Sequence, residues 1–213
     1  MANTLYIGTR RDSSWSLRGW LAVRLAGLEV DEAVIPLAGG ITAAIEALNP
    51  GGTVPYLEHD GNRIWDSLAI CEYCAEIAPA LWPLDRAART HARVIAAEMH
   101  AGFRALRQAM PMSLFRQPPA STEAGEEVAR IEEIWRDTRD RFGAGGAFLF
   151  GAAFGNADAM YAPIVARFLT YRPALSAGSR AYCDAVRAHP LVAAWYEAAA
   201  GEPAEWRLAQ YEA

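Results

Sequence analysis

The sequence predicts an α/β domain followed by an all-helical domain, an α/β plus all-α fold class. Two observations predict this fold. Short strand patterns alternate with helical patterns up to Ile77, whereas after Leu84 apolar residues recur only at helical intervals. Runs of strands and helices followed by helices alone indicate two units. We therefore expect domains at residues 1–80 and 85–213, joined by a linker at 81–84.

Each expected element of the first domain has a local signal, and the order is β-α-β-α-β-β-α. β-prone apolar runs predict strands at 4–8, 29–35, 54–58 and 63–65. Apolar residues three and four positions apart predict helices at 14–27, 42–48 and 66–77. The Asp60-Gly61-Asn62 turn between the last two strands is typical of a β-hairpin.

The second domain shows helical periodicity throughout. Its helices are expected at 86–107, 121–142, 156–171, 176–188 and 190–200, with a short tail at 206–211. The first of these should end near Pro111, because proline breaks the hydrogen-bond pattern of a helix. The second is rich in charge, and its charged residues indicate a solvated face.

The composition limits the classes of function. The 213 residues are 53% hydrophobic and 21% charged, which argues against disorder. The net charge of −5 supplies no basic field for nucleic acid or an anionic membrane. No apolar run reaches the roughly 20 residues of a membrane span, and residues 1–4 lead into a strand rather than a signal peptide. We expect a cytoplasmic protein without nucleic-acid or membrane partners.

Three cysteines, Cys71, Cys74 and Cys183, cannot all pair within one chain, which fits a reducing compartment. The first two have the spacing of a redox or zinc motif. They lie inside an apolar helical pattern, however, and no second Cys or His pair with zinc spacing follows. We therefore interpret them as buried structural cysteines and expect no metal site.

The stretch from Asn49 to Ser67 is the most informative one. Pro55 follows Val54 inside an apolar run, and proline cannot donate a strand hydrogen bond. The pair therefore indicates either an edge strand or a cis peptide bond. Asp66-Ser67 opens the next helix, where the simplest role of the aspartate is an N-cap.

Two further motifs carry a resemblance over essentially the full length. They are Ser13-Ser14-Trp15-Ser16-Leu17-Arg18-Gly19-Trp20-Leu21 and Glu98-Met99-His100-Ala101-Gly102-Phe103 with Leu106-Arg107 and Pro111-Met112. With Val54-Pro55 and Asp66-Ser67 they resemble the glutathione S-transferase superfamily, in a serine-type bacterial branch similar to the zeta class and maleylacetoacetate isomerase. The resemblance implies a thioredoxin-like N-terminal domain, a helical C-terminal domain, a homodimer and glutathione as cosubstrate.

The resemblance implies that Ser13, with Ser14 as second choice, activates the glutathione thiol. A helix N-terminus favours an anion and lowers the pKa of a thiol bound there. A serine hydroxyl can donate a hydrogen bond to the thiolate without ionising. The alternative is that either serine is only an N-cap. The position of Ser13 corresponds to the first cysteine of thioredoxin-like sites, so dithiol exchange is not expected.

The resemblance also implies the glutathione-binding residues. Val54 would bind the cysteinyl backbone through its main chain, with a cis Pro55 beside it. Asp66 would attract the γ-glutamyl ammonium, and Ser67 would hold the α-carboxylate. Thr53 stands where many relatives carry Lys, Gln or Arg. The glycyl carboxylate is therefore expected to be bound more weakly or by another residue, for which Arg11 is one candidate.

The remaining residues concern the second substrate and the helical domain. Trp15, Arg104 and Arg107 are candidates for the electrophile pocket, although interface or solvated charges are equally compatible with the arginines. Arg18 is expected to make a structural pairing. Asp158 is expected to be structural, at a helix start where Gly155 replaces the usual Ser or Thr cap.

The function expected from this resemblance is conjugation of glutathione to a small electrophile, as in detoxification. Two alternatives stay open: a glutathione-dependent cis-trans isomerase, and a non-catalytic binding or interaction protein with the same fold.

Overall fold

The computed structural model describes residues 3–38, 40 and 42–208. In the first domain the strands are β1 (Thr4–Gly8), β2 (Asp31–Ile35), β3 (Tyr56–His59) and β4 (Asn62–Trp65). The helices between and after them are α1 (Ser14–Leu25), α2 (Ala43–Glu46) and α3 (Ser67–Ile77). This order confirms the β-α-β-α-β-β-α pattern predicted from the sequence.

The strands form one sheet in the order β2-β1-β3-β4. β1 runs parallel to β2 and antiparallel to β3, and β3 pairs with β4 through the predicted hairpin. In the central register Leu5 lies opposite Leu57, and both are fully buried. Because β3 has a partner on each side, the edge-strand alternative for Pro55 is wrong, and Val54 and Pro55 lie just before the strand.

The helical part follows the short turn η1 (Pro79–Leu81). Its helices are α4 (Arg86–Ala101), α5 (Arg104–Ala109), α6 (Gly125–Phe142), α7 (Asn156–Tyr171), α8 (Ala177–Ala188) and α9 (Pro190–Ala200), followed by the turn η2 (Ala204–Trp206). Positions 209–211 of the predicted tail lie outside the described residues. α7 is buried along almost its whole length and forms the centre of this part.

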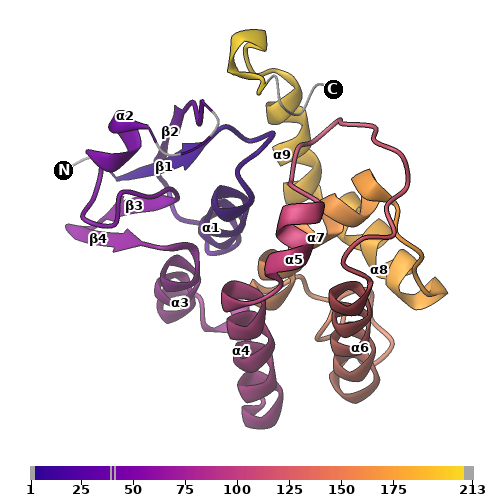
Figure 1. Cartoon of the computed structure of the whole chain (residues 1–213). Coiled ribbons are helices and arrows are strands. Elements are labelled where there is room, and N and C mark those ends of the chain that lie inside the picture. Colours follow the sequence, from indigo (N-terminus) through magenta and orange to yellow (C-terminus); the bar gives the residue numbers. More distant parts are fainter. Residues whose placement is uncertain (1–2, 39, 41, 209–213) are drawn as a thin grey trace.

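Helix α1 lies where the two parts meet. It packs against α3 on one side and α7 on the other, and Figure 1 shows it between the sheet and the helices α4 to α9. The fully buried Trp195 of α9 packs edge-on against Trp20 of α1, with ring centroids 5.4 Å apart. The N-terminal end of α1 therefore lies at the boundary between the sheet and the helical part.

The predicted helix at 86–107 is wrong in one respect, because the structure divides it into α4 and α5. Gly102 ends α4 with an extended backbone, and Phe103 adopts a left-handed conformation with φ 60°. The guanidinium of Arg107 donates to the backbone oxygens of Met99 and Gly102. These bonds satisfy carbonyl groups that the end of α4 leaves free, which stabilises the break.

Among the described residues, no helix combines the length and the apolar composition needed to cross a membrane. The three cysteines are free and buried, as the sequence predicts. Burial raises the pKa of Cys74 to about 12. A thiol with so high a pKa is inert at neutral pH.

Candidate glutathione site

Ser13 lies at the N-terminus of α1, directly after the turn that follows β1. It is the N-cap, and its Oγ accepts a hydrogen bond from the backbone N–H of Ser16 at 3.3 Å. Its side chain approaches β1 closely, since a Cβ on Gly8 would lie 3.2 Å from the Cβ of Ser13. Glycine at this position therefore lets the start of α1 approach the end of β1.

A short chain of hydrogen bonds joins Ser13 to the strand. The backbone N–H of Gly8 donates to Ser16 Oγ at 2.9 Å, and the Oγ atoms of Ser16 and Ser13 are 2.7 Å apart. Hydroxyl protons rotate to suit their partners. In this structure Ser13 Oγ donates to Ser16 Oγ, and rotation of the two hydroxyl groups frees the proton of Ser13 for a further acceptor. The capping role and a role towards a ligand are therefore compatible.

The N-terminus of α3 presents a second polar site. Asp66 is its N-cap, and Oδ1 accepts from the backbone N–H groups of Leu68 at 2.9 Å and Ala69 at 3.2 Å. Ser67, the first residue of the helix, is 1% exposed, and its Oγ has no hydrogen-bond partner among the described residues. A buried hydroxyl without a partner is costly, so this atom indicates a place where a ligand binds.

The Val54-Pro55 bond is cis, as one sequence alternative predicts. Pro55 packs against α1 at Gly19, where an added Cβ would lie 2.8 Å from the proline Cγ. Thr53 is held by its backbone oxygen, which accepts from Asn49 Nδ2 at 2.8 Å. The segment that contains these residues is thereby fixed against α1.

His100 of α4 reaches this site from the helical part. Its Nε2 lies 2.9 Å from Oδ2 of Asp66. Burial lowers the pKa of His100, the Asp66 carboxylate raises it, and the cations of Arg18 and Arg107 lower it further. His100 belongs to the motif at 98–103, but the sequence did not predict its contact with Asp66, because the two residues lie on different helices, α4 and the start of α3.

Trp15 is surrounded by cations at the same boundary. The guanidinium carbons of Arg18 and Arg107 lie 4.6 and 4.7 Å from its ring centroid, and the His100 ring contacts it edge-on at 5.3 Å. Cations over an aromatic face are attracted by the ring quadrupole. With 37% of its surface exposed, Trp15 presents an aromatic wall with two guanidinium groups near its ring.

The structural pairing expected for Arg18 is made to an aromatic ring. Arg18 is fully buried, and none of its guanidinium nitrogens has a hydrogen-bond partner among the described residues. Burial lowers its pKa, and the neighbouring Arg107 and Arg167 add to that effect. The ring of Trp15, rather than a carboxylate, is its recorded partner.

Three other residues predicted for the site, Arg104, Arg11 and Ser14, are not part of the group around the Trp15 ring. Arg104 is exposed at the start of α5 and, unlike Arg107, makes no ring contact with Trp15 among the described residues. The guanidinium of Arg11 lies 5.1 Å from the ring of Phe115. Ser14 is 6% exposed at the first position of α1.

Asp158 lies far along the chain, at the N-terminus of α7, and is buried there. Its oxygens accept from the backbone N–H groups of Leu149 at 3.1 Å and Gly155 at 3.0 Å, and from the Tyr182 hydroxyl at 3.0 Å. Burial raises its pKa to about 6, against the effect of these hydrogen bonds. All three donors belong to the helical part, so its contacts are structural.

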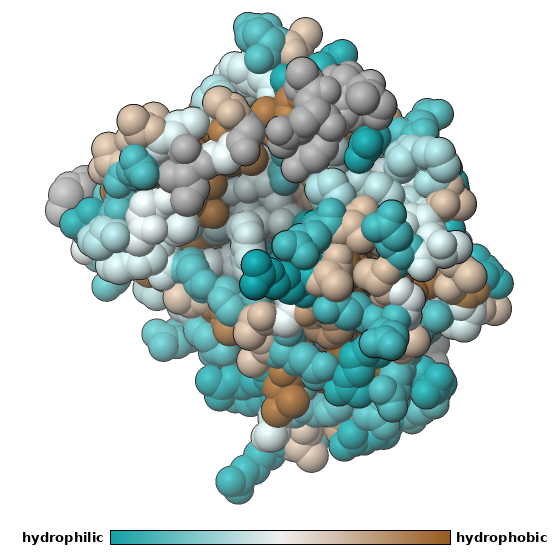
Figure 2. Space-filling view, viewed as in Figure 1, coloured by the Kyte–Doolittle hydropathy of each residue, from teal (hydrophilic) through white to brown (hydrophobic). Residues whose placement is uncertain are grey.

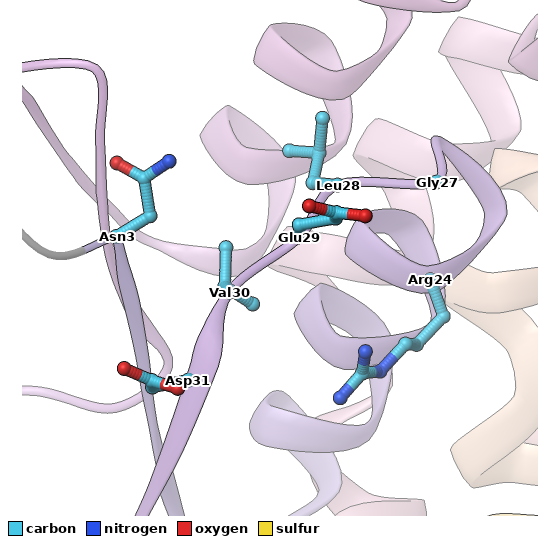
Figure 3. Close-up of a pocket in the computed structure, with 7 residues that line it drawn as sticks. All are labelled: Asn3, Arg24, Gly27, Leu28, Glu29, Val30 and Asp31. Carbon is cyan, nitrogen blue, oxygen red and sulfur yellow. The ribbon is translucent and has the colours of Figure 1, made fainter.

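Figure 2 shows the surface hollowed between the sheet-bearing half and the helical half, with hydrophilic residues at the edge of the hollow. A separate shallow pocket lies at the other end of α1, among residues from Asn3, Arg24 and 27–31 (Figure 3). With a rise of 1.5 Å per residue, the 12 residues of α1 put that pocket about 18 Å from Ser13. Across the described ranges, no group of three or more potential ligands could hold a metal ion.

Comparison with known proteins agrees with this architecture. A family model for the glutathione S-transferase N-terminal domain matches residues 12–77, and one for the C-terminal domain matches residues 87–198. Maleylacetoacetate isomerase of Rattus norvegicus is 30% identical over 81% of each chain. A probable maleylacetoacetate isomerase of Caenorhabditis elegans is 32% identical, over 54% of this chain and 55% of that protein.

A solved structure is similar over nearly the whole chain. It is the maleylacetoacetate isomerase of Anaeromyxobacter dehalogenans with glutathione bound in its active site, 25% identical, with a TM-score of 0.66. The match covers 91% of this chain and 94% of that one. The fold is therefore a thioredoxin-like domain followed by a helical domain. This chain belongs to the glutathione S-transferase family.

Proposed function

We propose that this protein is a glutathione transferase of the serine type, in which glutathione lies along Val54, Asp66 and Ser67. The observation that carries the proposal is the buried Ser67 Oγ without a partner at the N-terminus of α3. That hydroxyl and the backbone N–H of Ser67 suit the γ-glutamyl α-carboxylate, while the Oδ2 of Asp66 suits the ammonium beside it. The backbone of Val54 would pair with the cysteinyl residue.

The thiol of a glutathione bound in this way would lie at the start of α1. Ser13 Oγ would donate a hydrogen bond to the sulfur, with Ser14 as the second choice, and the positive end of the helix would favour the thiolate. The thiolate sulfur then forms a bond to the electrophilic carbon. Either a leaving group departs with the bonding electrons, or the substrate carbanion takes up a proton. Holding both reactants in place supplies much of the acceleration.

The glycyl carboxylate and the electrophile would be held by residues around this centre. Thr53 offers the carboxylate no charge, so Arg11 is the proposed partner. Trp15 would form one wall of the electrophile pocket, with Arg107 beside it and Arg104 at the rim. The pair of cations around Trp15 favours an electrophile with a polar or negatively charged group.

The test compares Ser13→Ala with Ser14→Ala in steady-state assays over a series of electrophiles. We expect Ser13→Ala to lower kcat by roughly 10²-fold, since removal of one stabilising donor at an anionic centre has effects of that order. Ser14→Ala should change kcat much less. Unchanged turnover in Ser13→Ala would eliminate this residue as activator, and binding of glutathione without any turnover of the wild type would indicate the non-catalytic alternative.

The names of both curated relatives favour a second candidate, a glutathione-dependent cis-trans isomerase. Here the thiolate adds to a conjugated double bond, the resulting single bond rotates, and the thiolate leaves unchanged. The two activities differ in stoichiometry. Product formation from a cis-configured unsaturated acid without consumption of glutathione would identify the isomerase, whereas one glutathione consumed per product identifies the transferase.

We also propose a cytoplasmic homodimer in which residues 1–80 and 85–213 are separate domains linked by 81–84. Sedimentation of the purified chain tests the dimer. Limited proteolysis tests the linker, where cleavage should fall at the exposed Leu84, since Leu81 and Trp82 are buried.

A further inference from the structure

The turn that leads into Ser13 is held from outside its own domain. Within the turn, the backbone N–H groups of Asp12 and Ser13 both donate to the carbonyl of Thr9, at 3.2 and 2.8 Å. Arg10 and Arg11 are the central residues of this turn. Their own backbone N–H and C=O groups point away from it, and buried groups of this kind need partners elsewhere.

All four of those backbone groups are bonded by the helical part of the chain. The N–H groups of Arg10 and Arg11 donate to Glu202 Oε1 at 2.7 Å and Oε2 at 3.3 Å. The carbonyl of Arg10 accepts from Trp195 Nε1 at 3.1 Å, and that of Arg11 accepts from the N–H of Leu114 at 2.9 Å. Three segments that are distant in sequence therefore converge on two residues.

Glu202 is the charged member of this set. It follows α9, its side chain is 3% exposed, and one carboxylate spans two successive amides. Arg10 Nη1 lies 3.8 Å from Oε1. Burial raises the pKa of Glu202, whereas the two amides and Arg10 lower it. A carboxylate is stable in such a place only when donors surround it, and the turn supplies them.

We propose that Glu202, which follows α9, is a positioning residue for the thiol site. The carboxylate fixes the conformation of the turn, and the turn sets where Ser13 Oγ and the first N–H groups of α1 point. Glu202 makes no recorded contact with Val54, Asp66 or Ser67. Replacement of Glu202 should therefore change the reactivity of the glutathione sulfur and not the affinity for glutathione. This inference rests on the proposed role of the α1 N-terminus.

The test uses Glu202→Gln, which keeps the shape of the side chain but turns an NH₂ group towards one of the two amides. We expect kcat to fall on the order of tenfold, because small displacements of a catalytic group have large effects. KM for glutathione should stay within about twofold. The pKa of bound glutathione, titrated through the ultraviolet absorbance of its thiolate, should rise towards the ~8.5 of a free thiol. Glu205→Gln, an exposed acid three residues away, is the matched control and should behave as wild type.

The outcomes separate this inference from the proposed function. A thiol pKa that rises in Ser13→Ala but stays at the wild-type value in Glu202→Gln overturns the inference and leaves the function intact. A pKa that rises in Glu202→Gln but not in Ser13→Ala supports positioning of the helix N-terminus and removes Ser13 as donor. Lower thermal stability of Glu202→Gln with unchanged kcat and thiol pKa overturns the inference. If Glu202→Gln does not fold, Glu202→Asp, whose shorter side chain reaches one amide only, carries the same expectation.

Discussion

Asp66 and Asp158 are both aspartates at helix N-termini, but their surroundings differ. Asp158 is buried, and each of its oxygens is occupied by donors from the helical part. Asp66 uses Oδ1 for the backbone of α3, while nearly half of its side-chain surface is exposed and Oδ2 meets His100. Next to it, the Ser67 hydroxyl is buried without a partner.

The difference shows how one capping chemistry serves two purposes. At α7 the donors around the carboxylate complete the packing. The site is therefore closed to a ligand, and its hydrogen bonds stabilise the fold. At α3 the Ser67 hydroxyl has no partner among the described residues and the Asp66 carboxylate is nearly half exposed, so the site is open to a ligand with a carboxylate and an ammonium group. Variants at the two helices should therefore separate stability from binding.

The largest effect is expected for Asp158→Ala. The change leaves three buried donors without an acceptor, and each such group costs roughly 1–3 kcal/mol, so the free energy of unfolding should fall by about 3–5 kcal/mol. Denaturant unfolding measures this. Asp184→Ala, an exposed acid on α8, is the control and should unfold as wild type.

The same variant carries a pH signature. The pKa of Asp158 is raised from 3.8 to about 6, so its contribution to stability is greatest at acidic pH and declines as the pH rises through about 6. The difference between wild type and Asp158→Ala should accordingly shrink from about pH 4 to about pH 7. A difference that grows over this range would contradict the burial argument.

In contrast to Asp158→Ala, Ser67→Ala should lower the affinity for glutathione and leave the stability of the fold intact. Removing a buried hydroxyl without a partner should leave the unfolding free energy unchanged or slightly higher. Affinity for glutathione, measured by calorimetry, should fall by about 10- to 150-fold, because a hydrogen bond to a charged group contributes roughly 1.5–3 kcal/mol. Equal losses of stability and affinity in this variant would place Ser67 with Asp158 as a structural residue.

The sequence predicted most of the fold because its signals are local. The alternation of strand and helix patterns, the Asp60-Gly61 turn and the Asp66 cap are each contained within a few residues. The break between α4 and α5 was missed, since the apolar spacing continues through Gly102 and Phe103 although the backbone does not. The break depends on Arg107 binding the end of α4, which periodicity does not encode.

The candidate site was predictable only where it follows a motif. Ser13, Pro55, Asp66 and Ser67 lie in recognisable local contexts, and the structure places each of them at α1 or at the start of α3. Glu202 was not predictable, because it meets Arg10 across 192 positions and belongs to no motif. Contacts of this kind depend on how α9 packs on α1, which the sequence alone does not reveal.

The smallest expected effect tests the contact that His100 of the helical part makes with Asp66. The His100 Nε2 and Asp66 Oδ2 atoms are 2.9 Å apart, and burial lowers the pKa of His100 below its usual 6.5. His100 is therefore neutral at about pH 7 and becomes a cation only as the pH falls further. As a cation it would compete with the glutathione ammonium for the Asp66 carboxylate, so KM for glutathione should rise about two- to threefold between pH 7 and pH 5.5. His100→Gln, which cannot ionise, should keep KM constant over the same range, and an equal rise in that variant would mean that another group titrates at the site.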